Sequence, residues 1–172
     1  MKLEIGAGEK PHPGYDLHVD MLALPGIAVR CGVDALPFAT GSLDALRANH
    51  VLEHQSYELV QETLREWARV LRPGAPVDIG VPDAKFVAAQ WVRGEVDTAE
   101  ANHWILGGHS ERAAHRGTDA RGVPLWIWNA HHTLFDAESL RAAVEACFVV
   151  EELFTYDIRN LRLHGRKPGG GQ

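Results

Sequence analysis

Short apolar runs separated by turn residues alternate with amphipathic stretches along most of this chain. Such alternation is typical of a parallel sheet whose strands are connected by helices. The runs that predict strands are residues 2–5, 16–20, 27–33, 43–48 and 77–81, followed near the end by 149–156 and 161–164. The last two runs follow one another closely and predict an antiparallel edge on the sheet.

Two stretches carry apolar residues at the spacing of a helix with one buried face. The first covers residues 57–71 and is ended by Pro73, which cannot continue a helix, and by Gly74, which accepts a left-handed turn. The second begins after Asp136, a residue suited to capping a helix, and carries Leu140 on its apolar side. Together with the strands, these helices predict an α/β fold.

Residues 84–133 show no regular period and are rich in histidine and tryptophan. We interpret this segment as a lid-like insertion over the functional site of a single domain that spans residues 1–165. Residues 166–172 are polar and rich in glycine, so they are expected to form a flexible tail.

The composition narrows the classes of protein to be considered. A chain of 172 residues that is 45% hydrophobic is sufficient for one globular domain. Its formal charge of −6 gives no positive field for a phosphate backbone, so duplex nucleic acid is a disfavoured partner. Cys31 and Cys147 form no C-x-x-C pair, and no apolar run has the length of a signal or a membrane span. We therefore expect a cytoplasmic protein without a membrane partner.

The first predicted strand runs directly into the turn Gly6-Ala7-Gly8. Glycines at the end of a strand let the backbone approach a nucleotide closely, because a side chain would occupy the ligand's space. A dinucleotide-binding motif would need a third glycine where Pro11 stands, and residues 9–14 contain too much proline for a full crossover helix. The turn therefore favours a nucleoside ligand without a phosphate group.

Acidic residues end the next two predicted strands. Asp20 follows the second and can accept both hydroxyls of a ribose, and Asp34 follows the third and can accept the amino group of an adenine. Asp20 could instead be an ordinary turn or cap residue. Their occurrence at successive strand ends beside the glycine turn favours a nucleoside site.

On these residues the chain resembles the class I S-adenosylmethionine-dependent methyltransferases, and more narrowly a small bacterial and phage group among them. The resemblance covers residues 3–83 well, resumes over 134–148 and ends at 165–168. The stretches that carry it are residues 3–8, 13–20, 34–38, 43–54, 69–74 and 81–83. It implies a three-layer Rossmann-like fold, mostly parallel with an antiparallel edge strand, in which the first crossover helix is lacking or short.

The resemblance also implies a set of residues around S-adenosylmethionine. The glycine turn would contact the methionine part, Asp20 the ribose and Asp34 the adenine. Glu4 would steady the methionine amino group, although it also reads as an outward-facing strand residue. The predicted cofactor-binding residues are Glu4, Gly6, Ala7, Gly8, Asp20, Asp34, Ala35, Asn49 and His50.

Methyl transfer requires an acceptor held in line with the donor and, where the acceptor bears a proton, a base to remove it. Histidine is the natural base near neutral pH. The candidates are His50, close to the donor, and His131 and His132, where the insertion rejoins the core. We expect His54, in contrast, to have a structural role.

Histidines of the insertion could also surround a metal ion. His109 and His115 could join His131 or His132 and the carboxylate of Asp83, since these groups suit zinc, iron or manganese. The spacing matches no standard signature, so the sequence assigns no metal.

The sequence thus predicts an S-adenosylmethionine-dependent methyltransferase acting on an oxygen or nitrogen atom of a small molecule, sugar or peptide in a biosynthetic or modification pathway. One alternative is a non-catalytic partner or regulatory subunit that binds S-adenosylmethionine. Another is a metal-dependent enzyme that uses the insertion histidines. The missing first helix would leave the donor pocket open on one side, so a homodimer is considered as the form that encloses the substrate.

Overall fold

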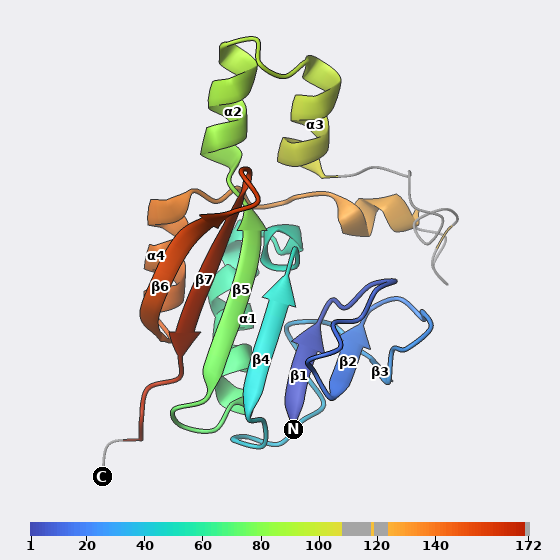
Figure 1. Cartoon of the computed structure of the whole chain (residues 1–172). Coiled ribbons are helices and arrows are strands. Elements are labelled where there is room, and N and C mark those ends of the chain that lie inside the picture. The colour runs from blue at the N-terminus through green and yellow to red at the C-terminus, as the bar shows by residue number, and fades with distance from the viewer. Residues whose placement is uncertain (108–117, 119–123, 171–172) are drawn as a thin grey trace.

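The computed structural model describes residues 1–107, 118 and 124–170 (Figure 1). Its strands form one sheet in the order β3-β2-β1-β4-β5-β7-β6, parallel except for β7, which runs antiparallel to both neighbours. The strands are β1 (Lys2–Ile5), β2 (Leu17–Asp20), β3 (Val29–Arg30), β4 (Ala45–Asn49), β5 (Pro76–Pro82), β6 (Val149–Tyr156) and β7 (Asn160–Arg166). The predicted α/β class and the antiparallel edge are therefore confirmed.

The strand order reverses between β1 and β4, which are parallel neighbours. In open α/β sheets, ligands bind in the crevice outside the carboxyl ends of the strands at such a reversal. The ends of β1 and β4 carry the glycine turn and the segment Asn49-His50, so the topology brings two distant parts of the sequence together at one edge of the sheet.

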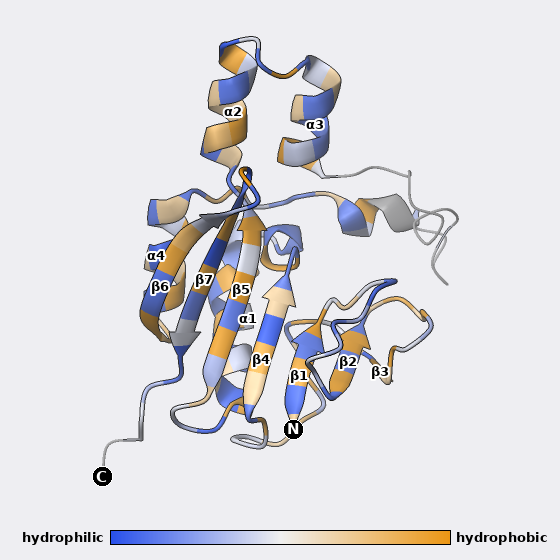
Figure 2. Cartoon of the chain, in the orientation of Figure 1, coloured by the Kyte–Doolittle hydropathy of each residue, from blue (hydrophilic) through white to orange (hydrophobic). Residues whose placement is uncertain are grey.

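Helices cover one face of the sheet. In Figure 1, α1 (Val60–Val70) and α4 (Ala137–Glu145) lie behind the strands. Trp67 of α1 is fully buried and donates its indole N–H to the carbonyl of Val33 at 2.9 Å. Strand residues that face these helices are apolar and alternate with polar ones, as the blue and orange segments along the strands in Figure 2 show.

Ionisable side chains, basic and acidic in turn, cross the other face of the sheet. They are paired in register across six strands, in the order His18, Glu4, Arg47, Asp78, His164 and Glu152. Arg47 joins two of them directly, with its Nε 3.2 Å from Glu4 and its Nη1 2.9 Å from Asp78. Within the described part of the chain, no helix packs over this row.

The loop from Gly6 to Asp16 connects β1 to β2 where a crossover helix is usual, as the proline content predicted. His12 in this loop donates its backbone N–H to Glu4 at 2.6 Å. The second helical layer of a three-layer fold is thus replaced, over β1, by a loop that binds to the charged row.

The insertion is more regular than predicted, because two short helices occupy its first half. Helix α2 (Ala84–Val92) is capped by the side chain of Asp83 and α3 (Thr98–Leu106) by that of Asp97. Neither helix has a pronounced apolar stripe, so the periodicity of the sequence did not reveal them. They stand as a pair beyond the carboxyl end of β5 in Figure 1.

Further short helical turns are η1 (Leu52–His54), η2 (Tyr57–Leu59) and η4 (Leu125–Asn129). The prediction of a flexible tail over residues 166–172 is wrong for its first two residues, because Arg166 belongs to β7 and Lys167 exchanges backbone hydrogen bonds with Gly74 and Ala75. No helix in the described ranges is both long and apolar enough to span a membrane.

Candidate functional site

The glycine turn at the end of β1 depends on both glycines for different reasons. Gly6 has φ 63° and Gly8 has φ 60°, a region that favours glycine. A Cβ atom on Gly6 would lie 2.4 Å from Cγ2 of Val51, whereas one on Gly8 would meet no atom within 4 Å. Gly6 thus permits close packing against the segment after β4, and Gly8 borders open space at the end of the sheet.

Asp20 holds the glycine turn in place. Its carboxylate accepts the backbone N–H of Gly8 at 2.9 Å and that of Leu22 at 2.8 Å. A carboxylate offers about four acceptor positions, so these two bonds leave capacity for ribose hydroxyls. Asp34 and Ala35 are exposed beyond β3. The residues at these strand ends therefore fit a nucleoside that lies across them.

Glu4 lies on the charged row rather than beside the glycine turn. It is 6% exposed, and its carboxylate contacts His12, His18 and Arg47. These contacts account for its burial without a ligand. Its predicted role at the methionine amino group stays a prediction.

His50 has an unusual backbone conformation directly after β4. Its φ is 56°, rare for a residue with a side chain, and its backbone N–H donates to Gly80 at 2.9 Å. Its ring Nδ1 lies 3.1 Å from Oε1 of Glu53, while the side chain remains 39% exposed. The next residue, Val51, packs on Gly6, so the backbone of His50 lies one residue away from the contact between this segment and the glycine turn.

Glu53 is a site residue that the sequence reasoning did not single out. Its side chain is 1% exposed within η1, and its Oε2 has no hydrogen-bond partner among the described residues. Burial alone would raise the pKa of this carboxyl, but the hydrogen bond from His50 and the nearby histidines hold it below its usual value. An acidic residue directly after the apolar pair Val51-Leu52 was the available signal.

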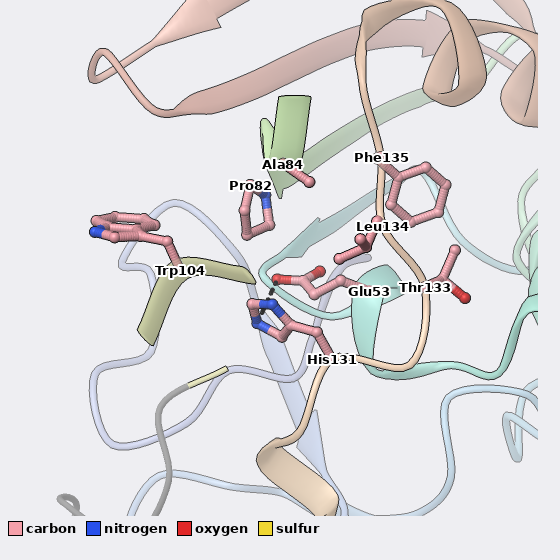
Figure 3. Close-up of a pocket in the computed structure, with 8 residues that line it drawn as sticks. All are labelled: Glu53, Pro82, Ala84, Trp104, His131, Thr133, Leu134 and Phe135. Atoms are coloured by element: carbon pink, nitrogen blue, oxygen red, sulfur yellow. Dashed lines mark ion pairs between the residues drawn. The ribbon is translucent and has the colours of Figure 1, made fainter. Parts of the chain in front are cut away.

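His131 approaches the same carboxylate from the end of the insertion. Its Nε2 lies 4.0 Å from Oε1 of Glu53, and its ring hydrogen-bonds to the backbone of Ile105 (Figure 3). Burial lowers the pKa of His131 to about 4, so its ring is neutral at pH 7. The ring of His54 packs edge-on against it, with centroids 5.1 Å apart.

Backbone hydrogen bonds join the two segments that carry these side chains. The carbonyl of Glu53 accepts the N–H groups of His132 at 2.8 Å and Thr133 at 3.1 Å. His54 donates its Nδ1–H to the carbonyl of Ala130 at 3.0 Å. The histidine that was expected to be structural therefore does anchor the end of the insertion, and it also contributes a ring to the cluster.

A small pocket lies beside this cluster, and in this structure it is too narrow to hold a water molecule. Figure 3 shows Glu53 and His131 pointing toward each other within it. Apolar side chains make up most of its wall, with Thr133 adding a polar group. The lining residues are Glu53, Pro82, Ala84, Trp104, His131, Thr133, Leu134 and Phe135.

His132 and Asp83, which were also weighed as site residues, do not line the pocket. His132 is exposed, and it is joined to the cluster by its backbone N–H, which donates to the carbonyl of Glu53. Asp83 caps α2 instead of approaching a metal. His109 and His115 lie outside the described residues.

Comparison with known proteins agrees with this geometry. Residues 13–77 match the family model described as a methyltransferase domain. A curated relative is the uncharacterized 37.1 kDa protein in transposon TN4556 of Streptomyces fradiae, 35% identical over 81 residues. That match covers 46% of this chain and 23% of the relative, so the chain matches less than a quarter of the relative's length.

Solved structures show the same fold. The 1,6-didemethyltoxoflavin-N1-methyltransferase of Burkholderia thailandensis, solved with 1,6-didemethyltoxoflavin and S-adenosylhomocysteine, superposes with a TM-score of 0.62 at 17% identity, over 97% of this chain and 70% of that one. The PH0226 protein of Pyrococcus horikoshii gives a TM-score of 0.66 at 11% identity, over 96% of this chain and 81% of that one.

The sheet order and the superposed structures show the α/β Rossmann-like fold of methyltransferases, and the family model for a methyltransferase domain matches less than half of the chain, residues 13–77. The residues predicted to bind S-adenosylmethionine lie at or beyond the carboxyl ends of β1 to β4, and their role toward this ligand stays a prediction. They are the glycine turn, Asp20, Asp34, Ala35, Asn49 and His50.

Proposed function

We propose that this chain transfers a methyl group from S-adenosylmethionine to an oxygen or nitrogen atom of a small molecule, sugar or peptide. His50 acts as the base that accepts the acceptor's proton. The observation that carries this proposal is the pair formed by His50 and the buried Glu53 beside the glycine turn, with Nδ1 and Oε1 3.1 Å apart.

The pair has the properties that proton transfer requires. With Nδ1–H donated to Glu53, the lone pair of the ring resides on Nε2, and the side chain is exposed enough to meet an acceptor. The ionised carboxylate stabilises the imidazolium formed when Nε2 takes the proton. A histidine held at positive φ, a conformation that costs roughly 1–3 kcal/mol, is typical of a functional position.

S-adenosylmethionine supplies the methyl group from a sulfonium that departs as a neutral thioether. The protein therefore needs to align the acceptor, remove its proton and exclude water. The acceptor's oxygen or nitrogen would be held with its proton directed toward His50, and that proton leaves as the new bond to the methyl carbon forms.

The pocket beside Glu53 is the proposed acceptor site, and it must widen to admit a substrate. Trp104, Leu134 and Phe135 give it apolar contacts, and His131 and Thr133 add polar groups that can orient a substrate (Figure 3). The Burkholderia relative binds a small molecule in its own structure, which supports a small molecule as the first acceptor class to test.

The test has two stages. Calorimetry with S-adenosylmethionine and S-adenosylhomocysteine measures cofactor binding, and a screen with labelled methyl donor then detects transfer to candidate acceptors. Binding with transfer supports the proposal. Binding without transfer to any acceptor class would favour the non-catalytic subunit, and absence of binding to either compound would overturn both interpretations.

A further inference from the structure

The strongest feature outside the proposed base pair is the second oxygen of Glu53. The side chain is 1% exposed, yet Oε2 finds no hydrogen-bond partner among the described residues. A buried carboxylate oxygen without a hydrogen-bond partner lowers the stability of the fold by about 1–3 kcal/mol or more. Such an atom in a folded protein therefore needs an explanation, for example a role in binding an ion. The other oxygen, Oε1, is engaged by His50.

Two imidazoles approach this carboxylate with one nitrogen each already committed. His54 donates Nδ1–H to the carbonyl of Ala130 at 3.0 Å, which leaves the lone pair on Nε2. His131 makes a ring hydrogen bond to the backbone of Ile105, while its Nε2 lies on the Glu53 side, 4.0 Å from Oε1. Histidines that bind metals almost always donate the other ring N–H to a carbonyl or carboxylate in this way.

Glu53, His54 and His131 each offer one ligand atom, and the three atoms lie within 4.8 Å of one another. Ligands of one zinc ion, bound at about 2.0–2.2 Å, lie closer together than this, so binding requires a modest contraction of the cluster. The backbone bonds from Glu53 to His132 and Thr133 already tie the two segments together and limit how far either must move.

We propose that Glu53, His54 and His131 form a binding site for one divalent transition-metal ion of the zinc or iron(II) class. Two neutral imidazoles and one carboxylate are the ligand set that such ions prefer, and they leave coordination positions free. This set differs from the histidine group weighed from the sequence, because His131 is its only shared member.

The location suggests a purpose for the ion. The pocket that contains Glu53 and His131 is the proposed acceptor site, so a substrate hydroxyl could occupy an open coordination position. There the ion would make the hydroxyl more acidic and direct it toward His50. This role rests on the proposed methyl transfer, whereas metal binding itself does not.

The test uses the full chain without an affinity tag, stripped with a chelator and titrated with Co²⁺ and with Zn²⁺. We expect calorimetry to show one ion bound per chain, and the visible spectrum of the Co²⁺ protein to show bands of a nitrogen- and oxygen-ligated site. Glu53→Gln, His54→Gln and His131→Gln should each weaken binding at least tenfold or so. Zn²⁺ should raise the melting temperature of the unaltered protein and not that of these variants.

Matched controls are Glu58→Gln and His103→Gln, the same substitutions at exposed residues that are not members of the cluster. Their affinity should equal that of the unaltered chain. Circular dichroism checks that each variant is folded, and if Glu53→Gln is not, the two histidine variants carry the test. The proposal is overturned if the chain binds neither ion, or if binding survives in the folded cluster variants. Because no methyl donor is present, either result is independent of the proposed methyl transfer.

Discussion

The exposed ring of His50 and the buried carboxylate of Glu53 meet at 3.1 Å directly beyond the carboxyl end of β4. One residue is exposed and the other is enclosed by the core, so the pair links the protein surface to a buried negative charge.

Replacing His50 by Gln should slow methyl transfer by about 10²–10⁴-fold, because the base is lost while the size of the side chain is nearly kept. Affinity for S-adenosylhomocysteine should change little. The measurement is the turnover of labelled methyl groups at saturating acceptor, alongside calorimetry. His103→Gln is the control, and equal rates for the two variants would contradict the role given to His50.

The two glycines of the turn should respond differently to alanine. Gly6→Ala forces a Cβ within 2.4 Å of Val51 at a positive φ, so overpacking and backbone strain together should cost about 2–4 kcal/mol of unfolding free energy. Gly8→Ala meets no neighbour and should cost only about 1–2 kcal/mol for its φ.

Gly8→Ala should also change the affinity for the cofactor. The added methyl group would project into the open space at the strand end, so the folded Gly8→Ala protein should bind S-adenosylhomocysteine more weakly. Urea denaturation and calorimetry on the same samples separate the two effects. Unchanged affinity would mean that the ligand does not pass over Gly8.

Asp20→Asn should reduce affinity for S-adenosylhomocysteine by about tenfold or more, since hydrogen bonds to a charged group contribute about 1.5–3 kcal/mol. The amide keeps one acceptor for the backbone of the turn, so most of the fold should survive. Asp16→Asn is a suitable control, because Asp16 also accepts a backbone N–H, from Lys2, but lies at the other end of the strands. Similar affinities for the two variants would remove Asp20 from the ribose site.

The charged row should make stability depend on pH through Asp78. Burial would raise the pKa of its carboxyl, but the hydrogen bonds and charge of Arg162, together with Arg47, hold it below the usual value. Because the folded-state pKa lies below that of the unfolded chain, the stabilisation is present above about pH 4 and is lost as the pH falls toward the folded-state pKa.

Asp78→Asn should therefore lower the unfolding free energy at pH 6 by roughly 2–4 kcal/mol, since both arginines lose a partner. The difference from the unaltered protein should shrink as the pH falls below about 4. Urea denaturation across this range measures it. A difference that stays constant with pH would show that the carboxylate's charge does not stabilise the fold.

Most of the sheet could be predicted because local patterns specify it. Apolar runs located six of the seven strands within a few residues, and Asp136 caps α4 through a reciprocal pair of hydrogen bonds with Ser139, as its position before an apolar face predicted. The third strand, Val29–Arg30, is shorter than expected. It lies at the edge of the sheet, so its length is set by how many of its residues pair with β2. Helices α2 and α3 were not predicted, because neither carries a periodic apolar stripe that the sequence alone would reveal. They are stabilised by their contacts in the folded chain instead.

The sequence by itself determined the α/β class, the glycine turn and the acidic residues at the strand ends, because each depends on residues close together along the chain. Only the tertiary structure brought Glu53 against His131, 78 positions away, and packed the ring of His54 against that of His131. Such a cluster arises when the insertion returns to the end of β4 and its backbone bonds to Glu53, and no local spacing encodes that meeting. Burial then decides the chemistry, since removing Glu53 and His131 from water changes what each group can bind.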